Sequence, residues 1–273
     1  TSAAWKPRKI HLFAPDRDRA KRIGDRLERM LQTAGLPLTA QPESADDLVI
    51  SIGGDGTFLS ALRRYRALNP VFCGVNAGHL GFLHEIDEDN LIPAVDRILK
   101  GQYFLEEHGL LAVQVLAAEG RAVRNHRAFN DVVVERRDTR TLRLLARVDG
   151  TELGPLIGDG VLVTSAGGST AYALAAGGAI VHPACPVLQL IPLHAHRSRI
   201  AASLYAPLIV PLDAVIELEP LWSQNRMPRL VIDGEEVALE EGERVRIERA
   251  PEGVRILRLG IASFWDRLRE KLL

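Results

Sequence analysis

The sequence has little cysteine and no apolar run long enough to cross a membrane. Its 273 residues include two cysteines, Cys73 and Cys185, each in a largely apolar stretch. So few cysteines argue against a disulfide framework and favour a reducing compartment, so we expect a cytoplasmic protein. No apolar run approaches the roughly 18 residues needed to span a bilayer, and the opening TSAAWKPRK lacks the apolar segment of a secretion signal. We therefore expect no membrane association.

The sequence also lacks an excess of charge of either sign. Thirty-four basic and 35 acidic residues leave a formal net charge of −1, so we expect no nucleic-acid partner. A hydrophobic content of 47% with 25% charged residues is typical of a globular protein and excludes a disordered or fibrous chain. At roughly 100 to 200 residues per domain, the length predicts one large domain or two ordinary ones.

The first hundred residues alternate between two periodicities. Short apolar runs that predict strands lie at 9–13, 47–52 and 71–75, and helical spacing of apolar residues follows at 20–34, from 58 onward and at 91–99. Asp16 or Asp18 could cap the first helix, and Gly35 with Pro37 would end it. This alternation predicts an α/β domain with a parallel sheet.

The pattern changes after residue 110, where short strand-like runs dominate. Turn signals separate them at Asp149-Gly150, Asp233-Gly234 and Pro251-Glu252-Gly253, and the alanine-rich stretch 169–180 predicts one helix. We expect a β-rich, sandwich-like second domain at 109–260. The amphipathic C-terminal segment should pack back on the first domain, so that 1–108 and 261–273 form one unit.

A glycine-rich loop follows the predicted strand at 47–52. Gly53-Gly54-Asp55-Gly56-Thr57 lies between that strand and a helix, where glycines let backbone N–H groups approach a phosphate. The Asp55 carboxylate could accept a proton from a hydroxyl or bind a metal attached to a nucleotide. A tight turn is an equally good explanation of this loop by itself.

Further polar loops follow other strands. Asn76 begins the loop Asn76-Ala77-Gly78-His79-Leu80-Gly81-Phe82-Leu83, which directly follows the predicted strand at 71–75. In the β-rich part, three segments together combine glycines with hydrogen-bond donors and acceptors suited to a ribose and a base. They are Asn130-Asp131, Gly158-Asp159-Gly160 and 167–172. Each piece alone is more simply a turn or cap. Thirteen of the 23 glycines nevertheless lie within 53–81 and 154–178, which concentrates them in these segments.

Together these segments resemble the NAD kinase family. The resemblance is carried by GGDGTFL (53–59), NAGHLGFL (76–83), ND (130–131), GDG (158–160), GSTAY (168–172), GGAIVHP (177–183) and the closing FWDRLREKL, in the family's order and approximate spacing. The GGDG loop is not specific, because diacylglycerol kinases, sphingosine kinases and phosphofructokinases also use it. The combination of this loop with NAGHLGFL and GSTAY is specific to the NAD kinase family.

The resemblance implies transfer of a phosphoryl group from ATP or polyphosphate to the 2′-hydroxyl of the adenosine ribose of NAD. It implies that Asp55 is the catalytic residue and that the donor phosphates lie at Gly53, Gly54, Gly56 and Thr57. It also implies a set of NAD-binding residues: Asp55, Gly56, Asn76, Phe82, Asn130, Asp131, Asp159, Ser169, Thr170, Ala171, Tyr172 and Asp233. A homodimer or homotetramer is implied as well.

Two features limit what the resemblance implies. Asp131 replaces the family's glutamate, which shortens its reach by one methylene, and Ala166-Gly167 stands where the family has Pro-Thr before the Gly-Ser-Thr-Ala-Tyr segment. The Ala166-Gly167 departure keeps open a non-catalytic dinucleotide sensor, and the shared GGDG loop keeps open a lipid kinase. The intact Asp55 argues against the sensor, and the NAGHLGFL and GSTAY segments argue against the lipid kinase.

The sequence offers no catalytic triad, no zinc-type cluster and no G-x-x-x-x-G-K-[ST] loop. Phosphoryl transfer depends mainly on positioning and charge neutralisation, with a divalent metal bridging the donor phosphates. We therefore expect Mg²⁺ carried by the phosphoryl donor, with few ligands from the protein and no dedicated metal site.

Overall fold

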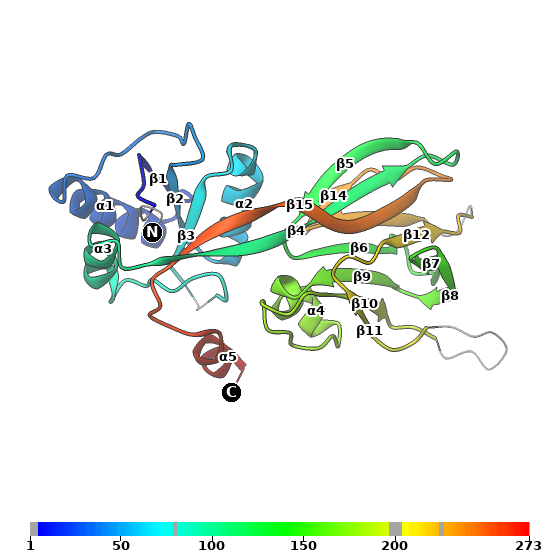
Figure 1. Cartoon of the computed structure of the whole chain (residues 1–273). Helices are drawn as coiled ribbons and strands as arrows, with labels where there is room; N and C mark the ends of the chain where they lie inside the picture. The colour runs from blue at the N-terminus through cyan, green and yellow to red at the C-terminus, as the bar shows by residue number, and fades with distance from the viewer. Residues whose placement is uncertain (1–4, 79–80, 197–203, 224–226, 273) are drawn as a thin grey trace. The chain divides into compact units, whose positions relative to one another are not determined.

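The computed structural model describes residues 5–78, 81–196, 204–223 and 227–272. It divides into two compact units (Figure 1). Unit 1 comprises Thr1–His108 and Val254–Leu273, and unit 2 comprises Gly109–Gly253. The chain therefore returns to unit 1 at Val254, earlier than the predicted residue 261.

Unit 1 is an α/β domain, as predicted. Its strands and helices are β1 (Ile10–Phe13), α1 (Asp18–Thr33), β2 (Leu48–Gly53), α2 (Asp55–Tyr65), a 3₁₀ turn (Arg66–Leu68), β3 (Val71–Asn76), α3 (Leu91–Leu99) and α5 (Phe264–Leu272). Strands β1, β2 and β3 are parallel neighbours, and β15 adds a further parallel pairing of Arg255 and Ile256 with β3. Helices α1 and α3 lie on one face of this sheet and α2 on the other (Figure 1).

Coverage on both faces explains the sequence of these strands. Every residue of β2 and β3 is buried. Strands covered on both sides become continuous apolar runs instead of alternating ones. The core between the sheet and helices α1 and α3 includes Ile23, Leu31, Ile50, Val75 and Leu91. This packing fixes the carboxyl ends of β2 and β3, from which two of the polar loops begin.

The predicted cap of α1 is wrong. Arg17 occupies the N-cap position in extended backbone, and no side chain caps the helix. Asp18 instead lies in the first turn, where a negative charge favours the helix dipole. The predicted end is confirmed, because Gly35 adopts a left-handed φ of 71° directly after the helix.

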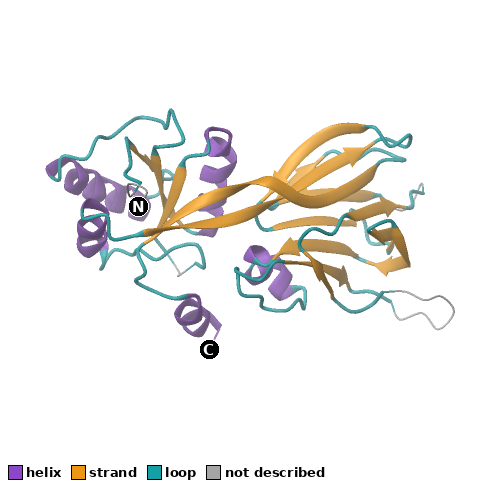
Figure 2. Cartoon of the chain, viewed as in Figure 1, coloured by secondary structure: helices purple, strands orange, loops and turns teal. Residues whose placement is uncertain are grey.

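Unit 2 is built almost entirely of strands (Figure 2). They are β4 (Phe104–Leu116), β5 (Ala122–Ala128), β6 (Asp131–Arg136), β7 (Leu142–Val148), β8 (Thr151–Gly158), β9 (Gly160–Ser165), β10 (Val187–Leu193), β11 (Leu208–Pro211), β12 (Ile216–Pro220), β13 (Pro228–Ile232), β14 (Glu235–Val237) and β15 (Arg244–Arg258), of which β4 and β15 extend into unit 1. A 3₁₀ turn (Gly167–Thr170) and the one-turn helix α4 (Tyr172–Ala175) interrupt them.

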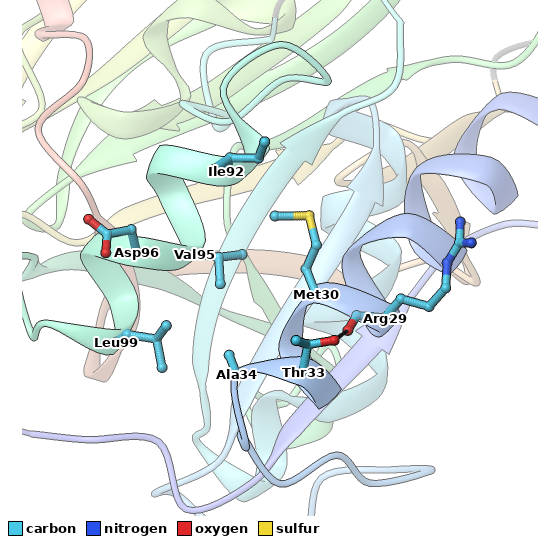
Figure 3. A pocket seen from close by; sticks show the side chains of 8 residues that line it. All are labelled: Arg29, Met30, Thr33, Ala34, Ile92, Val95, Asp96 and Leu99. Atoms are coloured by element: carbon cyan, nitrogen blue, oxygen red, sulfur yellow. Dashed lines mark hydrogen bonds between the residues drawn. The ribbon is translucent and has the colours of Figure 1, made fainter.

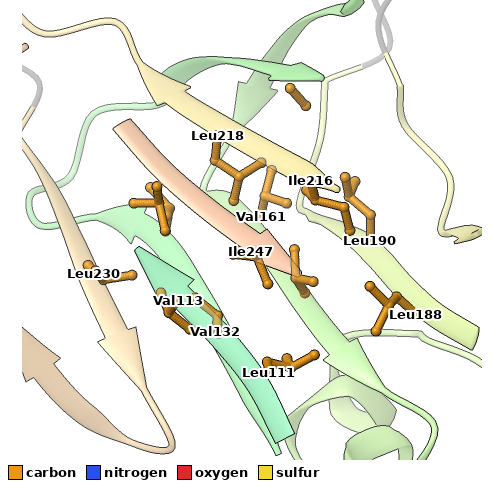
Figure 4. Close-up of a cluster of buried hydrophobic side chains, with 14 of the residues drawn as sticks. Leu111, Val113, Val132, Val161, Leu188, Leu190, Ile216, Leu218, Leu230 and Ile247 are labelled. Carbon is orange, nitrogen blue, oxygen red and sulfur yellow. The ribbon is translucent and has the colours of Figure 1, made fainter. Parts of the chain in front are cut away.

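Two sheets enclose the core of unit 2. One has the order β11-β10-β9-β6-β13-β14, and the other runs β15-β12-β7-β8 within this unit, with β4 pairing with β15 and β5. Apolar side chains of both sheets meet between them, including Val132, Val161, Leu190, Leu218 and Ile247 (Figure 4). This arrangement confirms the predicted sandwich-like domain.

Two local predictions in the β-rich part are wrong. Pro251-Glu252-Gly253 makes no turn, because β15 continues from Arg244 to Arg258. Pro251 lies between the stretch paired with β12 and the stretch paired with β3. The helix expected over 169–180 is reduced to α4, because Gly177 adopts a φ of 83° directly after it.

The predicted turns at Asp149-Gly150 and Asp233-Gly234 are confirmed, since all four residues have positive φ between paired strands. In the part of the chain that the structure describes, no helix is both long and apolar enough to cross a membrane.

Candidate active site

The first site segment is the loop between β2 and α2 in unit 1. Gly54 is the N-cap of α2, and its carbonyl accepts hydrogen bonds from the N–H groups of Thr57 and Phe58. A Cβ atom at Gly53 would lie 2.3 Å from Oγ1 of Thr57, so this glycine lets the threonine side chain fold over the backbone. A Cβ at Gly54 or Gly56 would meet nothing within 4 Å. The loop therefore offers open backbone at the positive end of a helix, which suits an anion.

Asp55 is the first residue of α2, and its carboxylate is held by groups of unit 1. The N–H groups of Phe82 and Leu83 approach it at 3.4 Å, and His84 Nδ1 lies 3.2 Å from Oδ1. Nζ of Lys271, near the end of α5, lies 3.6 Å from Oδ2 and 4.5 Å from the Phe82 ring centroid. The C-terminal helix thus packs on the first domain, as predicted, and brings a cation to the predicted catalytic residue.

These surroundings keep Asp55 ionised. Burial by itself raises the pKa of the carboxyl, but contact with His84 and the charge of Lys271 outweigh it and hold the pKa below its ordinary value. A carboxylate that is ionised at neutral pH can accept a proton from a hydroxyl group within reach. The side chain is 34% exposed, which leaves one side open to an incoming group.

The loop after β3 passes directly beside Asp55. Its first residue, Asn76, accepts a hydrogen bond from the Gly78 N–H at Oδ1 and donates one to the Gly78 carbonyl, so its amide is engaged within the loop. A Cβ at Gly81 would lie 2.1 Å from Oδ1 of Asp55, so this position requires glycine. Phe82 is buried. His79 and Leu80 of the same motif lie outside the described residues.

A second group of predicted residues gathers around Asp233 in unit 2. Its Oδ1 accepts the Asn130 N–H at 2.7 Å and the Asp131 N–H at 3.3 Å, and its Oδ2 accepts the Phe129 N–H at 2.8 Å. The Asn130 carbonyl in turn accepts the Thr164 hydroxyl at 2.7 Å. Asp233 therefore holds the backbone of the Asn130-Asp131 pair in place.

Asp131 differs electrostatically from Asp55. The side chain is buried, and burial together with the neighbouring Asp233 raises its pKa to about 7, although the Tyr172 backbone N–H opposes this shift. Asp131 therefore changes charge close to neutral pH, and it can act as a hydrogen-bond donor below that point.

The predicted stretch 169–172 contains inward and outward side chains. Ser169 is fully buried, and its hydroxyl bonds to both the N–H and the carbonyl of Val181 at 3.1 Å. Its side chain is therefore structural. Tyr172 is 46% exposed, and Thr170 and Ala171 are partly exposed. A Cβ at Gly168 would lie 2.1 Å from the Asn130 carbonyl oxygen, which shows how closely this stretch packs on the Asn130-Asp131 pair.

Asp159, between β8 and β9, forms a small ionic cluster. Arg136 lies 2.6 Å from one carboxylate oxygen and His194 Nδ1 lies 2.9 Å from the other. Burial tends to raise the pKa of Asp159, but the contacts with Arg136 and His194 outweigh it and lower the pKa. Arg136 is the last residue of β6, and nothing in its spacing along the sequence indicated this partner.

The predicted residues thus fall into two groups, one in each unit. Sequence reasoning missed His84 and Lys271, both in contact with Asp55. His84 directly follows the NAGHLGFL motif, so inspection of the flanking residue would have found it. Lys271 is far away along the chain, and only the packing of α5 brings it to Asp55.

A separate apolar groove lies between α1 and α3 (Figure 3). It encloses about 420 Å³ and is lined by Arg29, Met30, Thr33, Ala34, Ile92, Val95, Asp96 and Leu99. No residue of either predicted group lines it. Over the described ranges, no three His, Cys, Asp or Glu side chains come together in a way that could hold a metal ion.

Family models and curated relatives match this chain over both units. The model of the ATP-NAD kinase N-terminal domain matches residues 38–103, and the model of the C-terminal domain matches 129–259. An NAD kinase of Heliobacterium modesticaldum is 34% identical over 93% of this chain and 92% of its own length. An NAD kinase of Thiobacillus denitrificans is 39% identical over 83% of this chain and 76% of its own length.

Solved structures show the same fold. A yeast NADH kinase complexed with NADH superposes with a TM-score of 0.82 at 21% identity, covering 98% of this chain and 87% of the yeast chain. An NAD kinase from Archaeoglobus fulgidus in complex with ATP gives a TM-score of 0.74 at 24% identity, covering 96% and 99%. The matches over both units, together with the Asp55 loop and the Asn130-Asp131 pair, establish that this chain belongs to the NAD kinase family of phosphotransferases.

Proposed function

We propose that this chain transfers the terminal phosphoryl group of ATP, or of inorganic polyphosphate, to the 2′-hydroxyl of the adenosine ribose of NAD, which makes NADP. The observation that carries the proposal is the Asp55 carboxylate, kept ionised at the N-terminus of α2 beside open glycine backbone. A base and a phosphate cradle on adjacent residues are what transfer to a hydroxyl requires.

In this mechanism Asp55 orients the 2′-hydroxyl and accepts its proton. The hydroxyl oxygen forms a bond to the terminal phosphorus, and the bond from that phosphorus to the bridging oxygen breaks, which releases ADP or a shortened polyphosphate. The backbone at Gly53, Gly54, Gly56 and Thr57 contacts the donor phosphates at the positive end of α2. The protein therefore contributes mainly position and electrostatics.

We assign Mg²⁺ to the donor and not to a protein site. Carboxylate oxygen is a suitable ligand for Mg²⁺, and Asp55 supplies one such group next to the phosphate cradle. No larger cluster of metal-binding side chains exists among the residues with described positions. When bound with the donor, the cation neutralises phosphate charge.

For the acceptor, we assign contacts to both predicted groups. In unit 1 these are Asp55, Gly56, Asn76 and Phe82. In unit 2 they are Asn130, Asp131, Asp159, Thr170, Ala171 and Tyr172, with the backbone of Ser169. Because the Asp233 carboxylate is already engaged with three N–H groups, we assign it the role of holding Asn130 and Asp131 in place.

The family resemblance also leads us to propose a homodimer or homotetramer in the cytoplasm. Light scattering on the purified protein tests the assembly. A mass of two or four chains supports it, and a mass of one chain at working concentration contradicts it.

The direct test of the activity is the rate of NADP formation with Mg²⁺ and each donor. NAD and NADH are compared as acceptors, and ATP and polyphosphate as donors, which also measures both preferences. NADP formation with at least one donor supports the proposal. Absence of the product with both donors contradicts it.

The same assay separates the two alternatives. Diacylglycerol and sphingosine in vesicles serve as acceptors, and their phosphorylation without turnover of NAD would favour a lipid kinase. Calorimetric NAD binding without turnover would favour the dinucleotide sensor.

A further inference from the structure

His84 is completely buried beside Asp55, and the proposal above assigns it no contact with either substrate. Its relative exposure is 0%, and neither ring nitrogen has a hydrogen-bond partner of good geometry among the described residues. Nδ1 nevertheless lies 3.2 Å from Oδ1 of Asp55, which is within ion-pair reach but off the ideal hydrogen-bond direction. A buried imidazole whose polar atoms lack other partners is costly, so its placement calls for a compensating contact.

The space around His84 is built for an imidazole ring. A Cβ at Gly74 on β3 would lie 2.7 Å from the ring atom Cδ2, and a Cβ at Gly81 would lie 2.8 Å from Nδ1. The Phe58 ring of α2 meets the imidazole edge-on, with the centroids 6.0 Å apart. Gly74 and Gly81 thus leave just enough room for the imidazole, and the Phe58 ring packs against it. Together they hold the imidazole next to the Asp55 carboxylate.

The other contacts of Asp55 are weaker constraints. The two backbone N–H groups lie at the long distance of 3.4 Å, and Lys271 is a flexible side chain at 3.6 Å. Of the contacts between the Asp55 carboxylate and described residues, the one with His84 is the shortest and the most rigidly held. This contact lowers the pKa of Asp55 and so favours the ionised carboxylate.

We propose that His84 is the positioning residue for Asp55: its Nδ1 fixes the orientation of the carboxylate and keeps it ready to accept the substrate proton. This inference rests on the proposed role of Asp55 as base. The charged and titratable groups around the pair are Lys271 at Oδ2 and Arg258, whose Nη1 donates to the Leu83 carbonyl at 3.1 Å.

Two substitutions separate position from charge. His84→Asn retains an amide N–H near the position of Nδ1, but it cannot carry a positive charge. His84→Leu retains much of the volume and removes the polar contact. We expect kcat to fall by about tenfold or less in the Asn variant and by about a hundredfold in the Leu variant, because small misplacements of catalytic groups are costly. The KM for NAD should change little in either.

The pH dependence of kcat provides a readout that a purely structural role would not change. Without the imidazole, the effect of burial on Asp55 is opposed only by the charge of Lys271 and the Leu83 N–H, so the pKa of Asp55 rises. Since the base works in its ionised form, the acid limb of the profile should move to higher pH in His84→Leu. Thermal melts establish that each variant is folded.

His11→Asn is the matched control. His11 is a second buried histidine of unit 1, and its Nε2 lies 3.1 Å from the hydroxyl oxygen of Tyr65 at the far end of α2. Ten residues of helix separate Tyr65 from Asp55, about 15 Å at 1.5 Å per residue. This variant should therefore retain the wild-type kcat and pH profile.

The Asp55→Asn background distinguishes the two possible failures. If Asp55→Asn remains fully active, the proposed base is wrong. If Asp55→Asn is inactive while His84→Leu and His84→Asn behave like His11→Asn, the inference about His84 is overturned. If His84 acts through Asp55, His84→Leu should cause no further loss in the residual activity of Asp55→Asn.

Discussion

At the scale of single residues, the pKa of a buried carboxyl group depends strongly on the charges next to it. Asp55 and Asp131 are both aspartates in predicted site motifs, and burial raises the pKa of each. Contact with His84 and the charge of Lys271 reverse this for Asp55, whereas a second carboxylate adds to it for Asp131. Opposite shifts in two acidic residues allow one to act as a base and the other as a neutral donor at the same pH.

The raised pKa of Asp131 predicts a pH-dependent stability. Its pKa is about 7 in the folded chain against an ordinary value of 3.8, so the unfolded state loses the proton first as pH rises. The contribution to stability is therefore fully present below 3.8 and is lost as pH rises to about 7. Asp131→Asn should remove this decline, which amounts to at most about 1.4 kcal/mol per pH unit.

Denaturant unfolding of wild type and Asp131→Asn between pH 4 and pH 8 measures this difference. A difference between the two curves that does not change with pH would contradict the assignment.

Gly81 offers a second prediction for a single residue. A methyl group at this position would lie 2.1 Å from Oδ1 of Asp55, so Gly81→Ala must displace the carboxylate. We expect kcat to fall by about a hundredfold, as for a misplacement of about 1 Å. Gly78→Ala is the matched control in the same loop, because its Cβ would meet nothing within 4 Å. Equal rates for the two alanine variants would show that Asp55 is not constrained from this side.

Among the secondary-structure elements, α5 has an importance that its amphipathic pattern did not show. Besides Lys271, it contributes Arg267, which lies 3.1 Å from Glu85 with both side chains at most 7% exposed. Glu85 also accepts the Leu259 N–H at 2.8 Å. The buried pair therefore anchors α5 to the segment that carries Phe82 and His84.

Removing one partner of this pair should be costly. Arg267→Met leaves Glu85 buried without its cation, and we expect the free energy of unfolding to fall by about 3–5 kcal/mol. Combining it with Glu85→Gln, which keeps an acceptor for Leu259, should recover much of the loss. Chemical denaturation of both single variants and the double variant gives the coupling energy. Additive losses would show that the two side chains do not stabilise each other.

Regular elements could be predicted where periodicity dominates. Strands β2 and β3 and helices α1 and α3 follow from apolar spacing, because both faces of the sheet are covered. The turn at Pro251 was wrongly predicted because β15 pairs with other strands both before and after the proline. This pairing depends on neighbouring strands and cannot be read from the local sequence. The length of α4 was overestimated because alanine-rich composition does not show where Gly177 takes a positive φ.

At the scale of the whole molecule, the two largest apolar cores among the described residues support the two groups of site residues. One lies between the sheet and the helices of unit 1, and the other between the two sheets of unit 2. Motifs located Asp55, Asn130 and Asp131 because their chemistry is local to a loop. They could not locate Lys271, since its contact with Asp55 depends on the return of the chain to unit 1.

The role of Asp233 shows the same limit. Its position in a turn was predictable from Asp-Gly, but its three hydrogen bonds to the backbone around Asn130 come from a strand distant in sequence. The buried hydroxyl of Ser169 likewise depends on Val181. Sequence motifs therefore indicated which residues gather, and the fold showed which of them hold the others in place.

The central claim is that Asp55 accepts the proton of the NAD 2′-hydroxyl. The most direct measurement is the rate of NADP formation by Asp55→Asn with Mg²⁺ and the preferred donor, alongside calorimetric binding of NAD. Asp96→Asn is the matched control, because Asp96 is another helical aspartate of unit 1 and lies 2.7 Å from Lys100. We expect kcat to fall by about 10²–10⁴-fold in Asp55→Asn with NAD binding retained, and no change in the control. A wild-type rate in Asp55→Asn would contradict the account.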